Sequence, residues 1–462
     1  MDNKQREIRS RKVALIEIIF AQILLIILIT VCNNRKVWII SSLFILIFSY
    51  FYIKMEKGRL LTFMTIFLTL SYVLHMGQYI VIEFFSYDSN FLNAPNKVTC
   101  SSILFINICH ISFVIGSTKL TRRKKKISTL FLYRLDKQIL YYIGCFCIVC
   151  GVVPRLYIDI NQMLLQINGN YSESLEQMTQ YGWISILAQF FYVGVLILIF
   201  LSNSNVFRAR IILFIVCLWE IFTMLSGGRI YAISFIISMI YIYCLRVEKP
   251  TIKTIIIIGV IVYFGCIIMN IVADMRVTGG FSLNNVIKEV KDSFGKDNPI
   301  ILFIAEMGGT MKSMLYSVIN FPAYSEYAYG RSYIESIITA IPFADSILPI
   351  DDNHLVFIKH FRSSSYLGGS WLGEAYYNFS WLGFIVCYLW GKWIGKFENI
   401  FAEDTIENNY SRTLVILTFI FYIITYTRDY FARFATPIQM CGVLFVLSYC
   451  VGKIKQSLQR RC

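Results

Sequence analysis

The stretch VALIEIIFAQILLIILITVC, residues 13–32, decides the fold class of this chain, because it is a long apolar run with a single charge, Glu17. Apolar runs of about 20 residues are typical of helices that cross a bilayer. A second run, residues 37–53, follows after a short connector. Over the 462 residues, 57% are hydrophobic and 15% are charged, whereas soluble domains carry about 25% charged residues. The sequence therefore predicts an all-α, polytopic integral membrane protein.

The apolar runs predict about twelve membrane spans. An even number of crossings places both termini on one side of the membrane, and both termini are basic. Because basic residues favour the cytoplasmic side, we expect both termini in the cytoplasm. The predicted spans are 13–32, 37–53, 60–85, 98–118, 138–153, 183–202, 211–225, 230–245, 254–272, 371–391, 413–427 and 436–452.

The formal net charge of +15 reflects membrane orientation and not nucleic-acid binding. Most of the 43 Lys and Arg residues fall in connectors on the predicted cytoplasmic side, including the run Arg122–Lys126. This distribution follows the positive-inside rule, with anionic lipid headgroups as the partner. The basic start, residues 4–12, leads into a full-length span without a small-residue cleavage site, so we expect no cleavable signal peptide.

One long connector, residues 273–370, lies between the predicted spans nine and ten, on the outer side. It holds eight basic and ten acidic residues and no cysteine. Residues 284–296 predict an amphipathic helix. Residues 299–321 are too apolar for a free loop, so we expect them on the membrane surface or dipping into it. The chain is predicted to be one transmembrane domain, residues 1–462, with this loop inside it.

The turn Ser226-Gly227-Gly228-Arg229 is the first of three short motifs on the predicted outer side. Paired glycines permit a tight turn that exposes backbone N–H groups, and a helix is predicted to begin there with its positive dipole end. With the Arg229 guanidinium, this turn predicts an anion cradle. The alternative is a plain hairpin turn with an arginine that reaches to the membrane surface.

The second motif, Gly368-Gly369-Ser370-Trp371-Leu372-Gly373-Glu374-Ala375-Tyr376-Tyr377-Asn378-Phe379, leads into span ten. Glu374 lies about one turn into the predicted helix. A carboxylate at membrane depth is costly and usually faces a cavity or a cation. Two interpretations stay open: a direct role of Glu374 in a site, and a structural salt bridge to an arginine.

The third motif, Thr427-Arg428-Asp429-Tyr430-Phe431-Ala432-Arg433-Phe434, joins the last two spans. The charged residues of this motif lie among aromatic residues in the sequence, and we expect such a turn at the rim of a pocket. Arginine stays charged and binds phosphate through two parallel hydrogen bonds, which suits a diphosphate. Together these arginines predict a site for an anionic, membrane-bound ligand on the outer side: Arg229, Arg276, Arg428 and Arg433.

The sequence offers little support for metal, cofactor or histidine chemistry. The sequence has no nucleotide-binding or zinc-protease motif and no DxD element, so we expect neither a metal nor a cofactor. His75 and His110 fall inside spans, where we expect them to be packed or hydrogen-bonded. His354 and His360 lie in the long loop, and either is a candidate base on the acceptor side, although a surface histidine is the simpler interpretation.

The three motifs, in this order and with a long late loop, resemble the O-antigen polymerase family (Wzy, bacterial oligosaccharide repeat-unit polymerases). The resemblance covers most of the chain. The family usually has a glycine after the Asn-Phe pair, where this chain has Ser380.

The resemblance implies a GT-C-like, inverting, hexosyltransferase-type enzyme of the bacterial cytoplasmic membrane. Its substrates would be undecaprenyl-diphosphate-linked oligosaccharides, joined on the outer side with lipid diphosphate as the leaving group, and a chain-length regulator protein would be a partner. The essential arginines would be Arg229, Arg276 and those of the last turn. Fixed guanidinium groups stabilise such a leaving group without a metal. Glu374, Asp429 or a loop histidine would assist the acceptor hydroxyl.

Two rival functions stay open. An O-antigen ligase shares the long-loop layout but transfers the chain to the lipid A core. A flippase or transporter of lipid-linked oligosaccharide belongs to a different class. Transporters tend to show repeat symmetry and charged or broken helices at the midplane, and the sequence shows neither pattern.

Overall fold

A computed structural model gives the fold, and every regular element in the part that it describes is a helix. By their internal contacts these residues form two compact units that interleave along the chain. The first unit comprises 1–128, 304–403 and 426–433, and the second comprises 129–303, 404–425 and 434–462. The described residues are 3–86, 94–118, 135–167, 181–224, 229–249, 298–341, 368–402 and 410–459, with isolated positions between 251 and 291 and residue 344.

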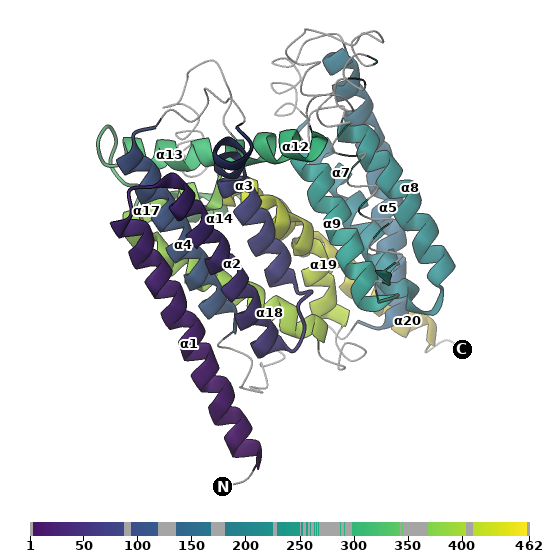
Figure 1. Cartoon of the computed structure of the whole chain (residues 1–462). Helices are drawn as coiled ribbons and strands as arrows, with labels where there is room; N and C mark the ends of the chain where they lie inside the picture. The colour runs from purple at the N-terminus through teal and green to yellow at the C-terminus, as the bar shows by residue number, and fades with distance from the viewer. Residues whose placement is uncertain are drawn as a thin grey trace. The chain divides into compact units, whose positions relative to one another are not determined.

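The first unit is built on four long N-terminal helices and on segments from the second half of the chain (Figure 1). Helix α12 crosses the boundary between the units, and its residues from Ile304 onward belong to the first. The elements are α1 (Asn3–Val31), α2 (Arg35–Lys57), α3 (Phe63–Phe85), α4 (Asn96–Thr118), α12 (Pro299–Met307), η4 (Gly308–Thr310), α13 (Met311–Asn320), α14 (Arg331–Ile338), α17 (Trp371–Phe379), η5 (Ser380–Leu382), α18 (Gly383–Ala402), η7 (Tyr426–Arg428) and η8 (Phe431–Phe434).

The second unit is a bundle in which α5 packs along α7, and α7 contacts α8 and α9 (Figure 1). Its core is apolar and aromatic, as in the Tyr192–Phe235–Phe421 cluster. The elements are α5 (Lys137–Ile167), α7 (Gly182–Leu201), η2 (Ser202–Ser204), α8 (Val206–Thr223), α9 (Arg229–Arg246), α19 (Tyr410–Thr425) and α20 (Ala435–Gln459).

The all-α membrane fold predicted from the apolar runs is confirmed, and nine of the described helices are long and apolar enough to cross a membrane. The predicted span 211–225 overlaps α8, and the predicted span 371–391 covers α17, η5 and the start of α18; α8 and α18 each carry three charged residues. The ninth predicted span, 254–272, lies mostly outside the described residues. The nine helices are Arg11–Val31, Arg35–Lys57, Phe63–Phe85, Asn96–Thr118, Lys137–Leu165, Gly182–Leu201, Arg229–Arg246, Tyr410–Arg428 and Phe431–Lys453.

The predicted end of the fifth span before Pro154 is wrong, because α5 continues through this proline to Ile167. Proline removes one backbone donor and crowds the preceding turn, which usually ends a helix. In membrane helices this loss is tolerated because neighbouring helices support the chain. Here Cys147 and Ile158, on either side of Pro154, are both buried. Tertiary packing therefore stabilises the helical conformation beyond Pro154.

Close packing of α18 against α4 depends on two glycines spaced as in a GxxxG motif, Gly391 and Gly395. A Cβ atom on Gly391 would lie 2.0 Å from the carbonyl oxygen of Phe113, and one on Gly395 would lie 2.2 Å from that of Ser117. Small residues allow membrane helices to approach backbone to backbone. This contact fixes α18, and α18 in turn supports α17.

The predicted tenth span is not one straight helix, since it breaks at Ser380 between α17 and α18. Ser380 has φ 52° and ψ −137°, a conformation that glycine adopts far more readily than other residues. Apolar composition carries no information on such a kink. The break ends α17 after nine residues, so that its carboxyl end meets the backbone of residues 328–330.

We expect Ser380→Gly to be more stable than Ser380→Ala by about 1–2 kcal/mol, because glycine relieves the positive φ and alanine does not. Both substitutions remove the hydrogen bond that Tyr327 donates to the Ser380 hydroxyl over 3.0 Å, so their difference isolates the backbone strain. Thermal unfolding of the detergent-solubilised protein measures it. Equal midpoints for the two variants would contradict the strained turn.

Residues 299–321, predicted to be too apolar for a free loop, form α12, η4 and α13. Helix α13 packs on α17, α4 and α3, and Met311 and Met314 are fully buried. The apolar residues of α13 are therefore used in packing within the first unit. The predicted amphipathic helix, 284–296, lies mostly outside the described residues.

Candidate functional site

Two of the three predicted motifs meet in the first unit, where the start of α17 lies against the turn between η7 and η8. A Cβ atom on Gly369 would lie 2.6 Å from the carbonyl carbon of Asp429 and 2.9 Å from the amide nitrogen of Tyr430. Only glycine allows the two backbones to approach so closely. Ser370 then caps α17 by accepting a hydrogen bond from the Gly373 N–H over 3.0 Å.

The Glu374 carboxylate is the centre of this contact and is 3% exposed. One oxygen accepts a hydrogen bond from the Ser332 hydroxyl at 2.9 Å. The other accepts from the Tyr426 hydroxyl at 3.2 Å and from the Phe431 backbone N–H at 2.9 Å. All three donors are neutral, and two of them belong to the turn that carries the arginines. The carboxylate thus ties the turn to α17.

A second layer of hydrogen bonds connects this carboxylate to the long loop. Asn378, which is fully buried, donates to the Ser332 hydroxyl over 2.8 Å and accepts from the Gly330 N–H over 3.0 Å. The backbone N–H of Tyr329 donates to the Asn378 carbonyl over 3.0 Å. The segment that begins α14 is therefore held on the carboxyl end of α17.

Asp429 orients Arg433 within the turn. One Asp429 oxygen lies 3.0 Å from Nε of Arg433, and the other accepts from the Tyr430 N–H over 2.9 Å. The Arg433 side chain is 53% exposed, whereas that of Asp429 is 10% exposed. Arg428 is half-buried, with Nη1 3.5 Å from Sδ of Met307. The turn presents two guanidinium groups, one of them steered by a buried carboxylate.

Tyr430 adds a neutral polar group beside these charges. Its side chain is partly buried, and it lies between the candidate spans that end at Arg428 and begin at Phe431. Burial raises the pKa of its hydroxyl above the ordinary value, and the Asp429 and Glu374 carboxylates raise it further. The hydroxyl therefore stays protonated at neutral pH.

The other predicted site residues belong to the second unit or lie outside the described residues. Arg229 is the first residue of α9 in the second unit and is 6% exposed, while the preceding turn, 225–228, lies outside the described residues. Arg276, His354 and His360 also lie outside them. Within the first unit, the structure therefore brings together Glu374, Arg428, Asp429 and Arg433.

The two histidines expected to be packed inside spans are hydrogen-bonded there, which confirms that expectation. Nδ1 of His75 lies 2.7 Å from the Ser71 carbonyl oxygen, and Nε2 lies 2.8 Å from the Ser370 hydroxyl. Nε2 of His110 lies 2.9 Å from the Ser71 hydroxyl. His75 thus helps to position Ser370, the cap of α17. Within the described residues, no three His, Cys, Asp or Glu side chains are grouped as metal ligands.

A buried charge cluster in the second unit was missed from sequence. Nε of Arg155 lies 2.8 Å from an oxygen of Asp159, and Nη2 lies 3.8 Å from an oxygen of Glu220. The guanidinium carbon lies 4.7 Å from the ring centre of Tyr192, and Trp219 donates to Asp159 over 3.0 Å. Charged residues inside or beside apolar runs are the signal that could have revealed it.

Comparison with known proteins identifies the family. A model of the O-antigen polysaccharide polymerase Wzy family matches residues 13–461, nearly the whole chain. A search of curated proteins with this chain finds no match, and a search of solved structures finds none either. The match spans the helices of both units and the three motifs, in agreement with the resemblance seen in the sequence. The chain therefore belongs to the O-antigen polysaccharide polymerase Wzy family, and it is a multi-pass membrane protein.

Proposed function

We propose that this chain polymerises undecaprenyl-diphosphate-linked oligosaccharide repeat units into O-antigen or a related surface polysaccharide, on the outer face of the cytoplasmic membrane. Family membership supports the reaction class. The observation that carries the proposal for the site is the turn of residues 426–433, which carries Arg428 and Arg433 and is bonded to Glu374 of α17. A lipid diphosphate is the anion that such paired guanidinium groups suit best.

The proposed reaction is a single displacement. A hydroxyl at the non-reducing end of the incoming lipid-linked repeat attacks the anomeric carbon that joins the growing chain to its lipid diphosphate. The new glycosidic bond forms as the bond to the diphosphate oxygen breaks, so the anomeric configuration is inverted. The hydroxyl proton passes to a base, and the departing diphosphate takes the negative charge that develops.

The arginines are proposed to stabilise that departing diphosphate, through Arg428 and Arg433 of the turn together with Arg229 and Arg276. Preorganised cations at the point where charge develops lower the barrier without reorganisation. The ion pair with Asp429 supports this role for Arg433, because it restricts a half-exposed side chain to one direction.

Glu374 is proposed to position the turn and not to accept the hydroxyl proton. Its two oxygens already accept three hydrogen bonds, and its exposed fraction is 3%. The candidates for the base are then Asp429 and the acceptor-side histidines of the loop, His354 and His360.

The chain is proposed to act as one glycosyltransferase domain, with both termini in the cytoplasm and residues 273–370 as a lid and acceptor surface. Each compact unit is assembled from separate stretches of sequence, so neither is a continuous domain that could be cut away. The hydrogen bonds between residues 329–332 and α17 support the lid, because they join the loop directly to the segment that holds the site.

Deletion of the gene in its host tests the proposal. We expect surface lipid that bears a single repeat unit, with the ladder of longer chains lost and then restored by the wild-type gene. A ligase would instead leave polymer on its lipid carrier, and a flippase would leave repeat units on the inner side. A full ladder in the deletion strain would refute polymerisation.

A further inference from the structure

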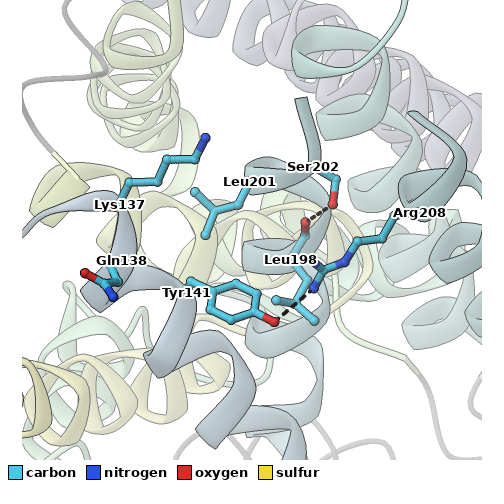
Figure 2. Close-up of a pocket in the computed structure, with 7 residues that line it drawn as sticks. All are labelled: Lys137, Gln138, Tyr141, Leu198, Leu201, Ser202 and Arg208. Atoms are coloured by element: carbon cyan, nitrogen blue, oxygen red, sulfur yellow. Dashed lines mark hydrogen bonds between the residues drawn. The ribbon is translucent and has the colours of Figure 1, made fainter. Parts of the chain in front are cut away.

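The second unit has a hollow at the end where α5 begins and α7 ends, far along α5 and α8 from the Arg155 cluster. Its cavity volume is about 350 Å³, within the range of about 300–1,000 Å³ that small-molecule sites occupy. Figure 2 shows Lys137 and Arg208 on opposite sides of the view, with Tyr141 between them. Polar groups also come from Gln138 and Ser202.

A second hollow of about 290 Å³ adjoins the first, because Lys137 and Leu201 line both. Arg246, at the last position of α9, lines this second hollow with Asn203 and Tyr410. Three cations from three helices thus line the two hollows, and Lys137 is shared by both. We refer to the two hollows as the basic basin.

The two arginines of the basic basin lie against aromatic rings. Arg208 donates to the Tyr141 hydroxyl over 3.4 Å, and its guanidinium carbon lies 5.3 Å from the ring centre. Arg246 lies 4.7 Å above the Phe200 ring. As far as the described residues go, neither lining includes Asp or Glu. Aromatic contacts fix the direction of a guanidinium and leave its charge uncompensated.

Arg210 gives a contrast to Arg208 on the same helix. It lies two residues beyond Arg208 on α8, outside both linings. Its Nη2 lies 2.7 Å from an oxygen of Glu248, and its Nε donates to the Tyr243 hydroxyl. Neighbouring arginines on one helix therefore differ: one is neutralised, and the other faces a cavity with its charge available to an anion.

Apolar surface begins directly beside the basin. Phe207, next to Arg208, is 74% exposed, and Tyr142, next to Tyr141, is 51% exposed. The exposed face of α5 continues at three- and four-residue intervals, which is one helix face. The exposed residues of this α5 face are Tyr142, Phe146, Val149, Val153, Tyr157, Ile160 and Leu164. A ligand with a phosphate head and apolar tails would match both features, whereas a soluble phosphate compound would use only the first.

We propose that the basic basin binds the phosphodiester headgroup of an anionic phospholipid, with the acyl chains against the exposed faces of α5 and α8. Its end of the unit is the predicted cytoplasmic side, where anionic lipids attract basic side chains. The basin would fix the depth and tilt of the second unit in the membrane. This role is separate from the proposed sugar transfer, which uses other residues.

The test is binding of short-chain phosphatidylglycerol to the full chain in detergent, followed through the thermal unfolding midpoint, with phosphatidylcholine as the zwitterionic comparison. Each cation near a phosphate contributes about fivefold in affinity. We therefore expect Lys137→Gln to weaken phosphatidylglycerol binding about fivefold and Lys137→Gln with Arg208→Gln about 25-fold. Arg210→Gln removes the same charge from the same helix and should leave the affinity unchanged within about twofold.

Lys137 is exposed, so Lys137→Gln keeps the test valid if the double variant does not fold. Equal binding of phosphatidylcholine and phosphatidylglycerol would overturn the proposal, as would equal loss of affinity in Arg210→Gln. Binding of inorganic phosphate is measured in the same way, as a second part of the test. If it stabilises the lipid-free protein as much as phosphatidylglycerol does, through the same residues, the basin is a site for a soluble anion and the lipid assignment is wrong.

Discussion

Glu374→Ala is expected to reduce polymer about a hundredfold, whereas Glu374→Gln is expected to keep most of the wild-type amount. Alanine removes the carboxylate that accepts hydrogen bonds from Ser332, Tyr426 and Phe431. Each unsatisfied buried group costs about 1–3 kcal/mol. The turn of residues 426–433 would then move from α17, and a displacement of about 1 Å at a reacting centre costs about a hundredfold in rate.

Glutamine can replace the carboxylate because of how the three donors are distributed. Its carbonyl oxygen can accept from Tyr426 and Phe431, which share one carboxylate oxygen. Its amide can donate to the Ser332 hydroxyl, which bonds the other oxygen and has lone pairs of its own. A positioning residue therefore tolerates glutamine, and a base that must accept a proton does not.

The measurement is the ladder of surface polysaccharide in a deletion strain that carries each variant, normalised to the amount of protein in the membrane fraction. Arg210→Gln, at an exposed pair distant in sequence from the turn, is the control for expression. If Glu374→Gln is as inactive as Glu374→Ala at equal protein levels, the positioning role is refuted and Glu374 is a candidate base instead.

The helices of this protein could be predicted because composition alone sets membrane spans. The run 60–85 became α3 (Phe63–Phe85), and the run 37–53 lies inside α2 (Arg35–Lys57). What composition could not predict is backbone detail. The fifth span was predicted to end at residue 153, whereas α5 continues through Pro154, because packing outweighs one lost hydrogen bond. Ser380 was expected inside a span, and it breaks the helix there. The break could not be predicted, because hydropathy does not report a positive φ.

The candidate site was predictable as a set of charged motifs but not as an arrangement. The residues Gly369 and Asp429 are far apart in sequence, and only the fold shows that their backbones touch. The sequence suggested a cavity or a cation for Glu374, yet its partners are two hydroxyls and an amide. Ser332 could not be singled out, since a serine in a long loop carries no distinctive pattern.

Replacement of Arg155 by glutamine is expected to destabilise the protein by about 3–5 kcal/mol, because it leaves two buried carboxylates without their cation. The side chains of Asp159 and Glu220 are 3% and 0% exposed, and that of Arg155 is 13% exposed. Thermal unfolding of the detergent-solubilised chain measures the loss. In the same unit, Arg210→Gln breaks an exposed pair, and exposed pairs contribute little to stability, so its midpoint should stay close to the wild type.

The combined variant Arg155→Gln, Asp159→Asn, Glu220→Gln separates charge from packing. It removes all three charges but keeps an acceptor for the Trp219 N–H and for the Thr223 hydroxyl, which bond the two carboxylates. Buried ion pairs replaced as a whole by neutral groups are often as stable as the original, because the desolvation cost disappears with the attraction. The combined variant should therefore recover most of the stability that Arg155→Gln loses. If it is no more stable than the single variant, packing of Arg155 on Tyr192 explains the loss and the charge balance does not. If it is stable but makes no polymer, the cluster also acts in the reaction, since a purely structural cluster would be replaced without loss of activity.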